Sequence, residues 1–112
     1  MKRETAAPNA CRVTAQYRLR DADGFVYELN GMGATLAVHV SRSSTGNNDE
    51  DWCVAAHNGT DANGIVISES APTRTEALPR VARSWSEKSF DLSLPRFDWD
   101  AITTALVAVR AI

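Results

Sequence analysis

The sequence predicts an α+β fold: a single domain in which an antiparallel sheet of five to six strands, a meander plus a hairpin, is followed by two C-terminal helices packed on one face. Three observations predict it. Residues 12–41 alternate apolar and polar side chains between turn sequences, residues 52–70 repeat that pattern, and apolar spacing after residue 71 becomes helical. Strands followed by helices are typical of α+β domains.

Composition agrees with one globular domain. The 112 residues are 44% hydrophobic and 23% charged, enough to bury a core without disulfides or metal. The net charge of -2 provides no overall attraction to nucleic acid or to an anionic membrane. We expect residues 1–10 to be a flexible N-terminal tail and 11–112 to form the domain. Without a secretory signal or a membrane-length apolar run, we expect a cytoplasmic protein.

The first three strands form a meander. Residues 12–20 alternate strictly, so one face should carry Val13, Ala15, Tyr17 and Leu19. The turn sequences "DADG" and "NGMG" separate this strand from two more, at 25–29 and 34–41. Their core-facing residues should be Phe25, Tyr27, Leu29, Leu36, Val38 and Val40.

A second hairpin follows the polar stretch 41–51, which we expect to be an exposed loop because it has no apolar residue. The segments "WCVAAH" and "IVISES" flank "NGTDANG", in which Asn-Gly tolerates the positive φ of hairpin turns. The core face of this hairpin should carry Trp52, Val54, Ala56, Ile65 and Ile67.

The stretch "APTRTEALPRVARSW" offers two starts for the first helix. With Thr73 as N-cap, Glu76 completes a capping box, but Pro79 becomes the sixth helical residue, at a cost of about 3 kcal/mol. With Thr75 as N-cap, Pro79 stays among the first four positions, whose N–H groups lack intrahelical partners anyway. We therefore predict a helix from near Thr75. Its core stripe is Leu78, Val81, Ala82 and Trp85.

Two more elements complete the chain. Alternation in "SFDLSLP" predicts a short edge strand that ends at Pro95. In "FDWDAITTALVAVRAI", Asp98 is the predicted N-cap of a terminal helix with Ile102, Leu106 and Val109 on its core side. The β-branched residues of this segment leave a final strand over 106–112 as an alternative.

No motif for catalysis, metal or cofactor binding emerges. Cys53 and His57 share a strand face, but four residues of strand separate them by roughly 13 Å, too far for one metal ion. The glycines of "GMG" and "DADG" lack the context of phosphate or calcium loops. No nucleophile-elbow sequence is present. We expect no enzyme, no cofactor and no metal, with Cys11 and Cys53 as free thiols.

The preferred function is a non-catalytic protein-interaction or regulatory module, as a homodimer or with another protein. A chain that stops on "ALVAVRAI" must bury that segment internally or against a partner. The candidate partner-binding residues are Arg80, Arg83, Leu106, Val109 and Ile112.

A single-stranded nucleic-acid-binding sheet is the alternative, and a small enzyme without a recognisable motif is a third. The candidate nucleic-acid contacts are Arg12, Arg18, Arg20, His39 and His57. Single-strand binders pair such cations with stacking aromatic rings on the same face. Here the aromatic residues of the strands alternate onto the opposite face, so this function ranks second.

Overall fold

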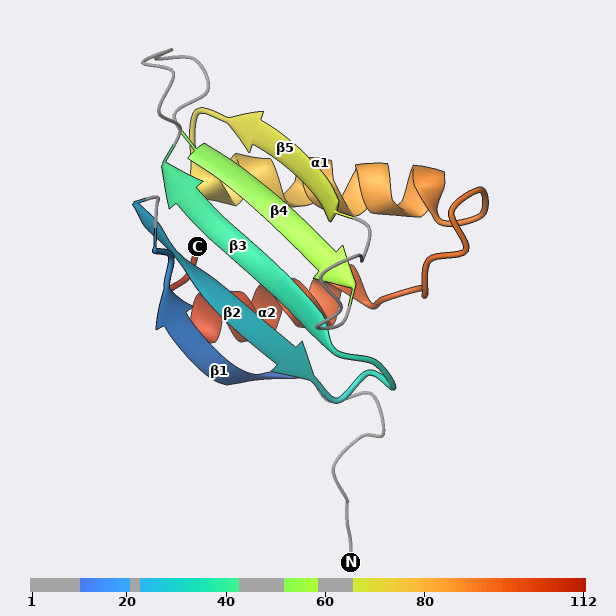
Figure 1. The fold of residues 1–112 in the computed structure, drawn as a ribbon, viewed down its shortest axis with the longest axis horizontal. Coiled ribbons are helices and arrows are strands. Elements are labelled where there is room, and N and C mark those ends of the chain that lie inside the picture. The colour runs from blue at the N-terminus through green and yellow to red at the C-terminus, as the bar shows by residue number, and fades with distance from the viewer. Residues whose placement is uncertain (1–10, 21–22, 43–51, 59–65) are drawn as a thin grey trace, which may run out of the picture.

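Five antiparallel strands form one open sheet, and two helices follow them in the chain (Figure 1). The computed structural model describes residues 11–20, 23–42, 52–58 and 66–112. The elements are β1 Arg12–Arg18, β2 Gly24–Asn30, β3 Leu36–Arg42, β4 Trp52–Asn58, β5 Val66–Ala71, α1 Arg74–Lys88 and α2 Trp99–Ala108. The strand order is β1-β2-β3-β4-β5, a meander. The predicted α+β class is confirmed.

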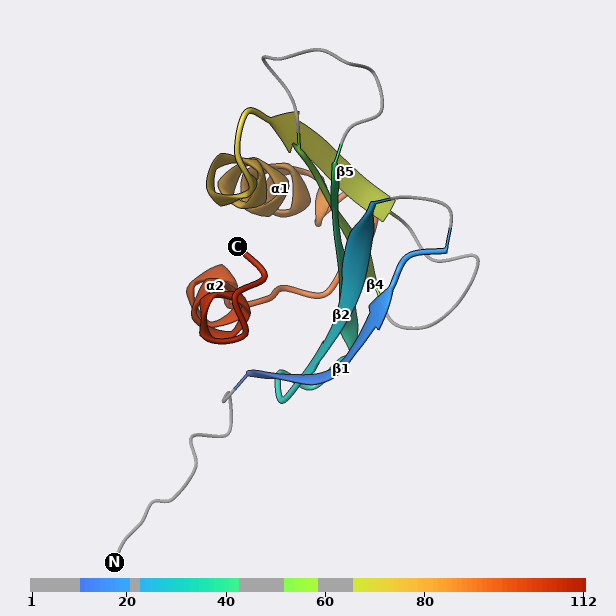
Figure 2. The ribbon, with the colours of Figure 1, turned by 90° about the vertical axis from the view of Figure 1, so that its left-hand side faces the viewer.

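Both helices lie on the same side of the sheet (Figure 2). Helix α1 packs on β4 and β5, and α2 packs beside β1. The core between the two layers contains Tyr27, Leu29, Leu36, Val38, Val40, Val54, Ala56, Ile67, Leu78, Val81, Trp85, Ile102 and Leu106. We call the other side of the sheet, which no helix covers, the open face. The predicted core residues of β2, β3 and β4 therefore face the helices, and Trp52 packs at the margin of the core.

Some expectations fall on parts of the chain outside the described residues. These are the tail 1–10, most of the loop 41–51, the turn 59–64 and the predicted core residue Ile65. No helix in the described ranges has the length and apolar content needed to cross a membrane.

A β-bulge in β1 corrects the predicted alternation of this strand. Val13 pairs with Leu29, but Ala15 pairs with Glu28, so the register shifts between them. The extra residue of a bulge moves every later side chain to the opposite face. Tyr17, predicted in the core, therefore lies on the open face with 49% of its surface exposed, and Arg18 faces the helix side.

Helix α1 begins two residues earlier than predicted. Thr73 is the N-cap: its Oγ1 accepts a hydrogen bond from Glu76 N at 3.1 Å and donates one to the Glu76 carboxylate at 3.0 Å. Pro79 is consequently the sixth residue of a continuous helix. Thr75, whose carbonyl loses its partner, is exposed, as is Pro79, so water can hydrate that carbonyl. The capping box and the buried stripe outweigh the proline.

The predicted strand at "SFDLSLP" is wrong. Residues 89–93 continue as turns after α1: Leu92 N donates to Lys88 O, and Leu94 N donates to Ser89 O. Ser93 adopts a positive φ of 53°. This bonding is the pattern of a helix C-terminus with a left-handed residue. Phe90 is consequently 91% exposed, and only Leu94 of the alternating apolar residues is buried.

The terminal helix is confirmed, and the alternative strand over 106–112 is wrong. The Asp98 side chain accepts a hydrogen bond from Ala101 N at 3.1 Å and caps α2. At the other end, Ala111 N donates to Leu106 O at 2.8 Å and Arg110 N donates to Val107 O at 3.0 Å, a Schellman motif with Arg110 at φ 62°. The motif turns Ala111 back into the core.

Replacing Pro79 tests the observed helix start. Pro79→Ala restores the N–H that can bond to the Thr75 carbonyl, so the free energy of unfolding should rise by about 1–3 kcal/mol in urea denaturation. Pro72→Ala, a control just before the N-cap, should instead lower stability by at most about 1 kcal/mol. If Pro79→Ala raised the free energy of unfolding no more than Pro72→Ala does, the expected cost of the missing bond to the Thr75 carbonyl would be contradicted.

Candidate functional site

The predicted partner-binding residues do not form one surface. Leu106 is fully buried in the core, so this residue cannot reach a partner in this fold, and Ile112 packs partly buried against the core. Val109 is 39% exposed beside a shallow groove between β1 and α2. Arg83 is exposed on α1, whereas Arg80 donates to Ser70 O of β5 at 2.6 Å. Of the C-terminal segment, Leu106 and Ala111 are therefore buried by the chain itself, whereas residues 107–110 are exposed.

The predicted nucleic-acid contacts are also divided between faces. Arg12 precedes the bulge and pairs with Asn30 at the end of the open face. The guanidinium of Arg18 lies 5.3 Å from the ring centroid of Phe25, on the helix side. Arg20 follows the end of β1 and is exposed. The three arginines therefore do not surround His39 and His57.

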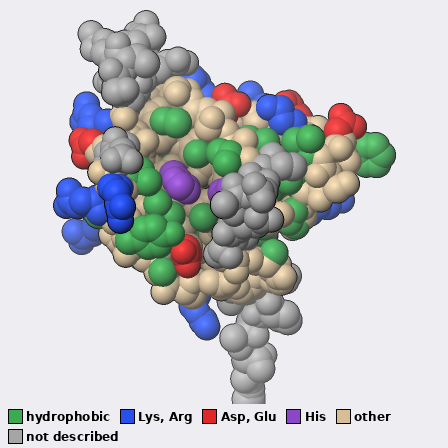
Figure 3. All heavy atoms as spheres, in the orientation of Figure 1, with side chains coloured by type: hydrophobic (Ala, Val, Ile, Leu, Met, Phe, Trp, Pro, Cys, Tyr) green, Lys and Arg blue, Asp and Glu red, His purple; other side chains and the backbone are tan. Residues whose placement is uncertain are grey.

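His39 and His57 instead lie at the centre of the open face. Ala37 is opposite His57, and His39 is opposite Ala55, so the two histidines are diagonal neighbours on β3 and β4. Together with Tyr17, Glu28, Ala37, Ala55 and Val66 they line a shallow hollow of about 290 Å³, which we call the central hollow. Figure 3 shows histidine side chains among hydrophobic and uncharged ones, with lysines and arginines toward the margins.

Two groups of the central hollow, His39 and Tyr17, are held in their uncharged forms at neutral pH. Partial burial, and secondarily the neighbouring His57, lower the pKa of His39 below its usual value, which favours the neutral imidazole. The Tyr17 hydroxyl donates a hydrogen bond to Glu28 Oε2 at 2.9 Å. This bond to Glu28 is the main reason that the pKa of Tyr17 is raised, so the phenol stays protonated.

The central hollow offers hydrogen-bonding groups around a floor of small apolar side chains. Glu28, His39 and His57 are potential metal ligands by type, but in the described ranges no three histidine, cysteine or carboxylate side chains lie close enough to hold a metal ion. Cys11 and Cys53 are free thiols. The arrangement is typical of a binding surface with a few placed polar groups.

Sequence reasoning placed the histidines on this face but missed Tyr17 and Glu28. Strict alternation over residues 12–20 assigned Tyr17 to the core, and nothing in those residues marks Thr14 and Ala15 as the site of a bulge. The register shift in the pairing of β1 with β2 brings Tyr17 next to Glu28.

Comparisons of the chain with protein-family models, curated proteins and solved structures find no significant match. Its function is therefore argued from the geometry of its own residues.

The lowered pKa of His39 predicts an acid-sensitive fold. Because the unfolded state binds the proton more readily, the free energy of unfolding should fall as pH drops from about 7 through the unfolded pKa near 6.5 toward the lower folded pKa. His39→Gln should flatten this part of the pH profile in urea denaturation. Ser68→Ala, on the same face without a titrating group, should keep the wild-type slope. An unchanged slope in His39→Gln would contradict the assignment.

Proposed function

We propose that this protein is a non-catalytic protein-interaction module that forms a homodimer through the open face of its sheet. The composition of that face carries the proposal. An uncovered face of an antiparallel sheet is normally polar, but here large apolar side chains are exposed on it: Tyr17 is 49% and Val66 is 55% exposed, beside the small side chains of the central hollow. Such a surface is typical of a contact site, because water solvates it poorly.

The sheet edges are poor alternatives for the contact. A bulge interrupts β1, and arginines lie at both of its ends. On the opposite edge, the Arg80 guanidinium bonds to the Ser70 carbonyl of β5. Bulges, charges and occupied backbone groups are features that oppose the pairing of edge strands between molecules. These features favour contact through the face.

A second copy of the chain suits the face because the described lining of its centre has no lysine or arginine and a single carboxylate, that of Glu28. In a two-fold dimer each group meets the same patch on its partner, so a charged centre would repel itself. The neutral form of His39 limits that repulsion, and the Glu28 carboxylate has a donor on its own chain in the Tyr17 hydroxyl. Small residues such as Ala37 and Ala55 also permit two sheets to approach to the usual spacing of about 10 Å.

The homodimer is tested by mass. Size-exclusion chromatography with light scattering at pH 7.5 should give twice the chain mass of 12.2 kDa. Ala55→Arg places a charge at the centre of the open face and should shift the protein to a folded monomer by circular dichroism. Thr103→Arg, on the exposed side of α2, is the matched control and should remain dimeric.

Two results would contradict this assignment. A wild-type monomer at all concentrations would refute the homodimer. A dimer that survives Ala55→Arg but is released by Val109→Glu would place the contact at the C-terminal surface.

One observation keeps nucleic acid as a second candidate: Tyr17 shares the open face with Arg12 and the histidines. If single strands bind there, Tyr17→Ala and Arg12→Ala should each weaken binding, the former by about tenfold through lost stacking, and added salt should weaken it further. Arg18→Ala, on the other face, is the control. Fluorescence anisotropy with a labelled oligonucleotide measures all three, and no binding at low salt would remove this candidate.

A further inference from the structure

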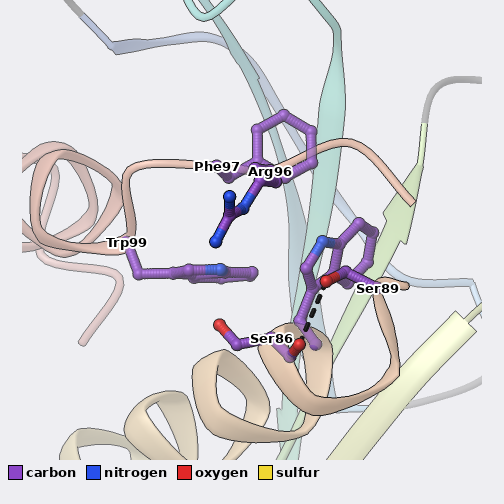
Figure 4. Close-up of a pocket in the computed structure, with 6 residues that line it drawn as sticks. Ser86, Ser89, Arg96, Phe97 and Trp99 are labelled. Carbon is purple, nitrogen blue, oxygen red and sulfur yellow. Dashed lines mark hydrogen bonds between the residues drawn. The ribbon is translucent and has the colours of Figure 1, made fainter. Parts of the chain in front are cut away.

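A second pocket lies in the helical layer, between the C-terminal end of α1 and the start of α2. Its lining consists of Trp85, Ser86, Ser89, Arg96, Phe97 and Trp99, and its volume is about 150 Å³ (Figure 4). Drug-sized ligands require roughly 300–1,000 Å³. The pocket therefore suits a small chemical group. We call it the Arg96 pocket.

Three aromatic rings form rigid walls of the Arg96 pocket. The ring centroids of Trp85 and Phe97 are 5.5 Å apart, those of Trp85 and Trp99 are 5.9 Å apart, and those of Phe97 and Trp99 are 6.4 Å apart. Trp85 is anchored by a hydrogen bond from its Nε1 to Pro95 O at 2.9 Å. Ser89 is held by a bond from its hydroxyl to Ser86 O at 3.0 Å. The walls are thus fixed by the fold.

Two hydrogen-bond donors of the pocket have no acceptor. The Nε1 of Trp99 is buried and lacks a hydrogen-bond partner among the described residues. The guanidinium of Arg96 points toward the Trp99 ring in Figure 4, and no carboxylate in the described ranges pairs with it. The unpaired Trp99 N–H is costly because it is buried, whereas the exposed guanidinium of Arg96 is open to water and to a ligand.

The charge at the pocket selects an anion. Aromatic walls also suit a quaternary ammonium group, but the Arg96 guanidinium would repel it. None of the six lining residues is acidic. The adjacent Asp98 is engaged elsewhere: its carboxylate caps α2 through Ala101 N, and, after burial, its charge is the second cause that raises the pKa of Cys11 beside β1.

We propose that the Arg96 pocket binds a carboxylate group. The planar, exposed guanidinium of Arg96 supplies the donors for its oxygens, and a short apolar stem packs against the rings of Phe97 and Trp99. The carboxylate comes from a free organic acid or from an acidic side chain of a bound peptide. Because the pocket is in the helical layer, this site is separate from the proposed dimer face.

Nuclear magnetic resonance of the three indole N–H groups tests this site in the full chain. Titration with benzoate, or with glutamate blocked at both backbone ends, should give a saturable shift of the Trp99 signal, which Trp99→Phe identifies. Arg96→Gln should weaken binding by about tenfold or more because it removes the charged donor. Arg83→Gln, another exposed arginine, is the matched control and should bind as wild type.

The two ligands distinguish the source of the carboxylate: tighter binding of blocked glutamate indicates an acidic peptide, and tighter binding of benzoate indicates a free acid. Benzamide, neutral and of the same shape, should not bind. The proposal is overturned if no saturable shift occurs up to about 10 mM carboxylate, if Arg96→Gln binds as wild type, or if inorganic phosphate binds equally well.

Discussion

The packing of Trp85 holds together the two helices and the segment between them, all of which follow the sheet in the chain. The ring is 1% exposed, and it belongs to the stripe by which α1 covers β4 and β5. Its indole N–H holds the Pro95 carbonyl, and its ring contacts Phe97 and Trp99. One side chain therefore joins α1, the segment before α2 and the first residue of α2. The walls of the Arg96 pocket are a consequence of that core contact.

The β1 bulge determines which side chains of β1 lie on the open face, as Trp85 determines the walls of the Arg96 pocket. It moves Tyr17 out of the predicted core and next to Glu28, and it moves Arg18 to the helix side. The exchange removes a cation from the open face and adds a phenol whose hydroxyl bonds to the Glu28 carboxylate. A register shift of one residue thus replaces a guanidinium by a half-exposed aromatic ring, which is a side chain that the proposed dimer contact uses.

The two proposed sites differ in chemistry and lie in different layers of the fold. The open face is broad and shallow, and the described lining of its centre has no lysine or arginine, as suits a protein surface. The Arg96 pocket is small, aromatic and cationic, as suits a single anionic group. Each can therefore be occupied without the other, and a ligand in the Arg96 pocket leaves the sheet face free.

The sequence by itself determined the strands of the meander, both helices and the core residues of β2, β3 and β4, because local periodicity reports which side of an element is buried. It also placed His39 and His57 on the same face of the sheet, and the register of β3 with β4 made them diagonal neighbours. Tertiary structure decided the rest. The bulge depends on how β1 pairs with β2, and the start of α1 at Thr73 depends on whether water reaches the Thr75 carbonyl. The Arg96 pocket forms only because Trp85 of α1 packs against Phe97 and Trp99. Strand pairing, solvation of a carbonyl and packing between separate segments each depend on residues that are far apart in the sequence, so no short window of residues encodes them.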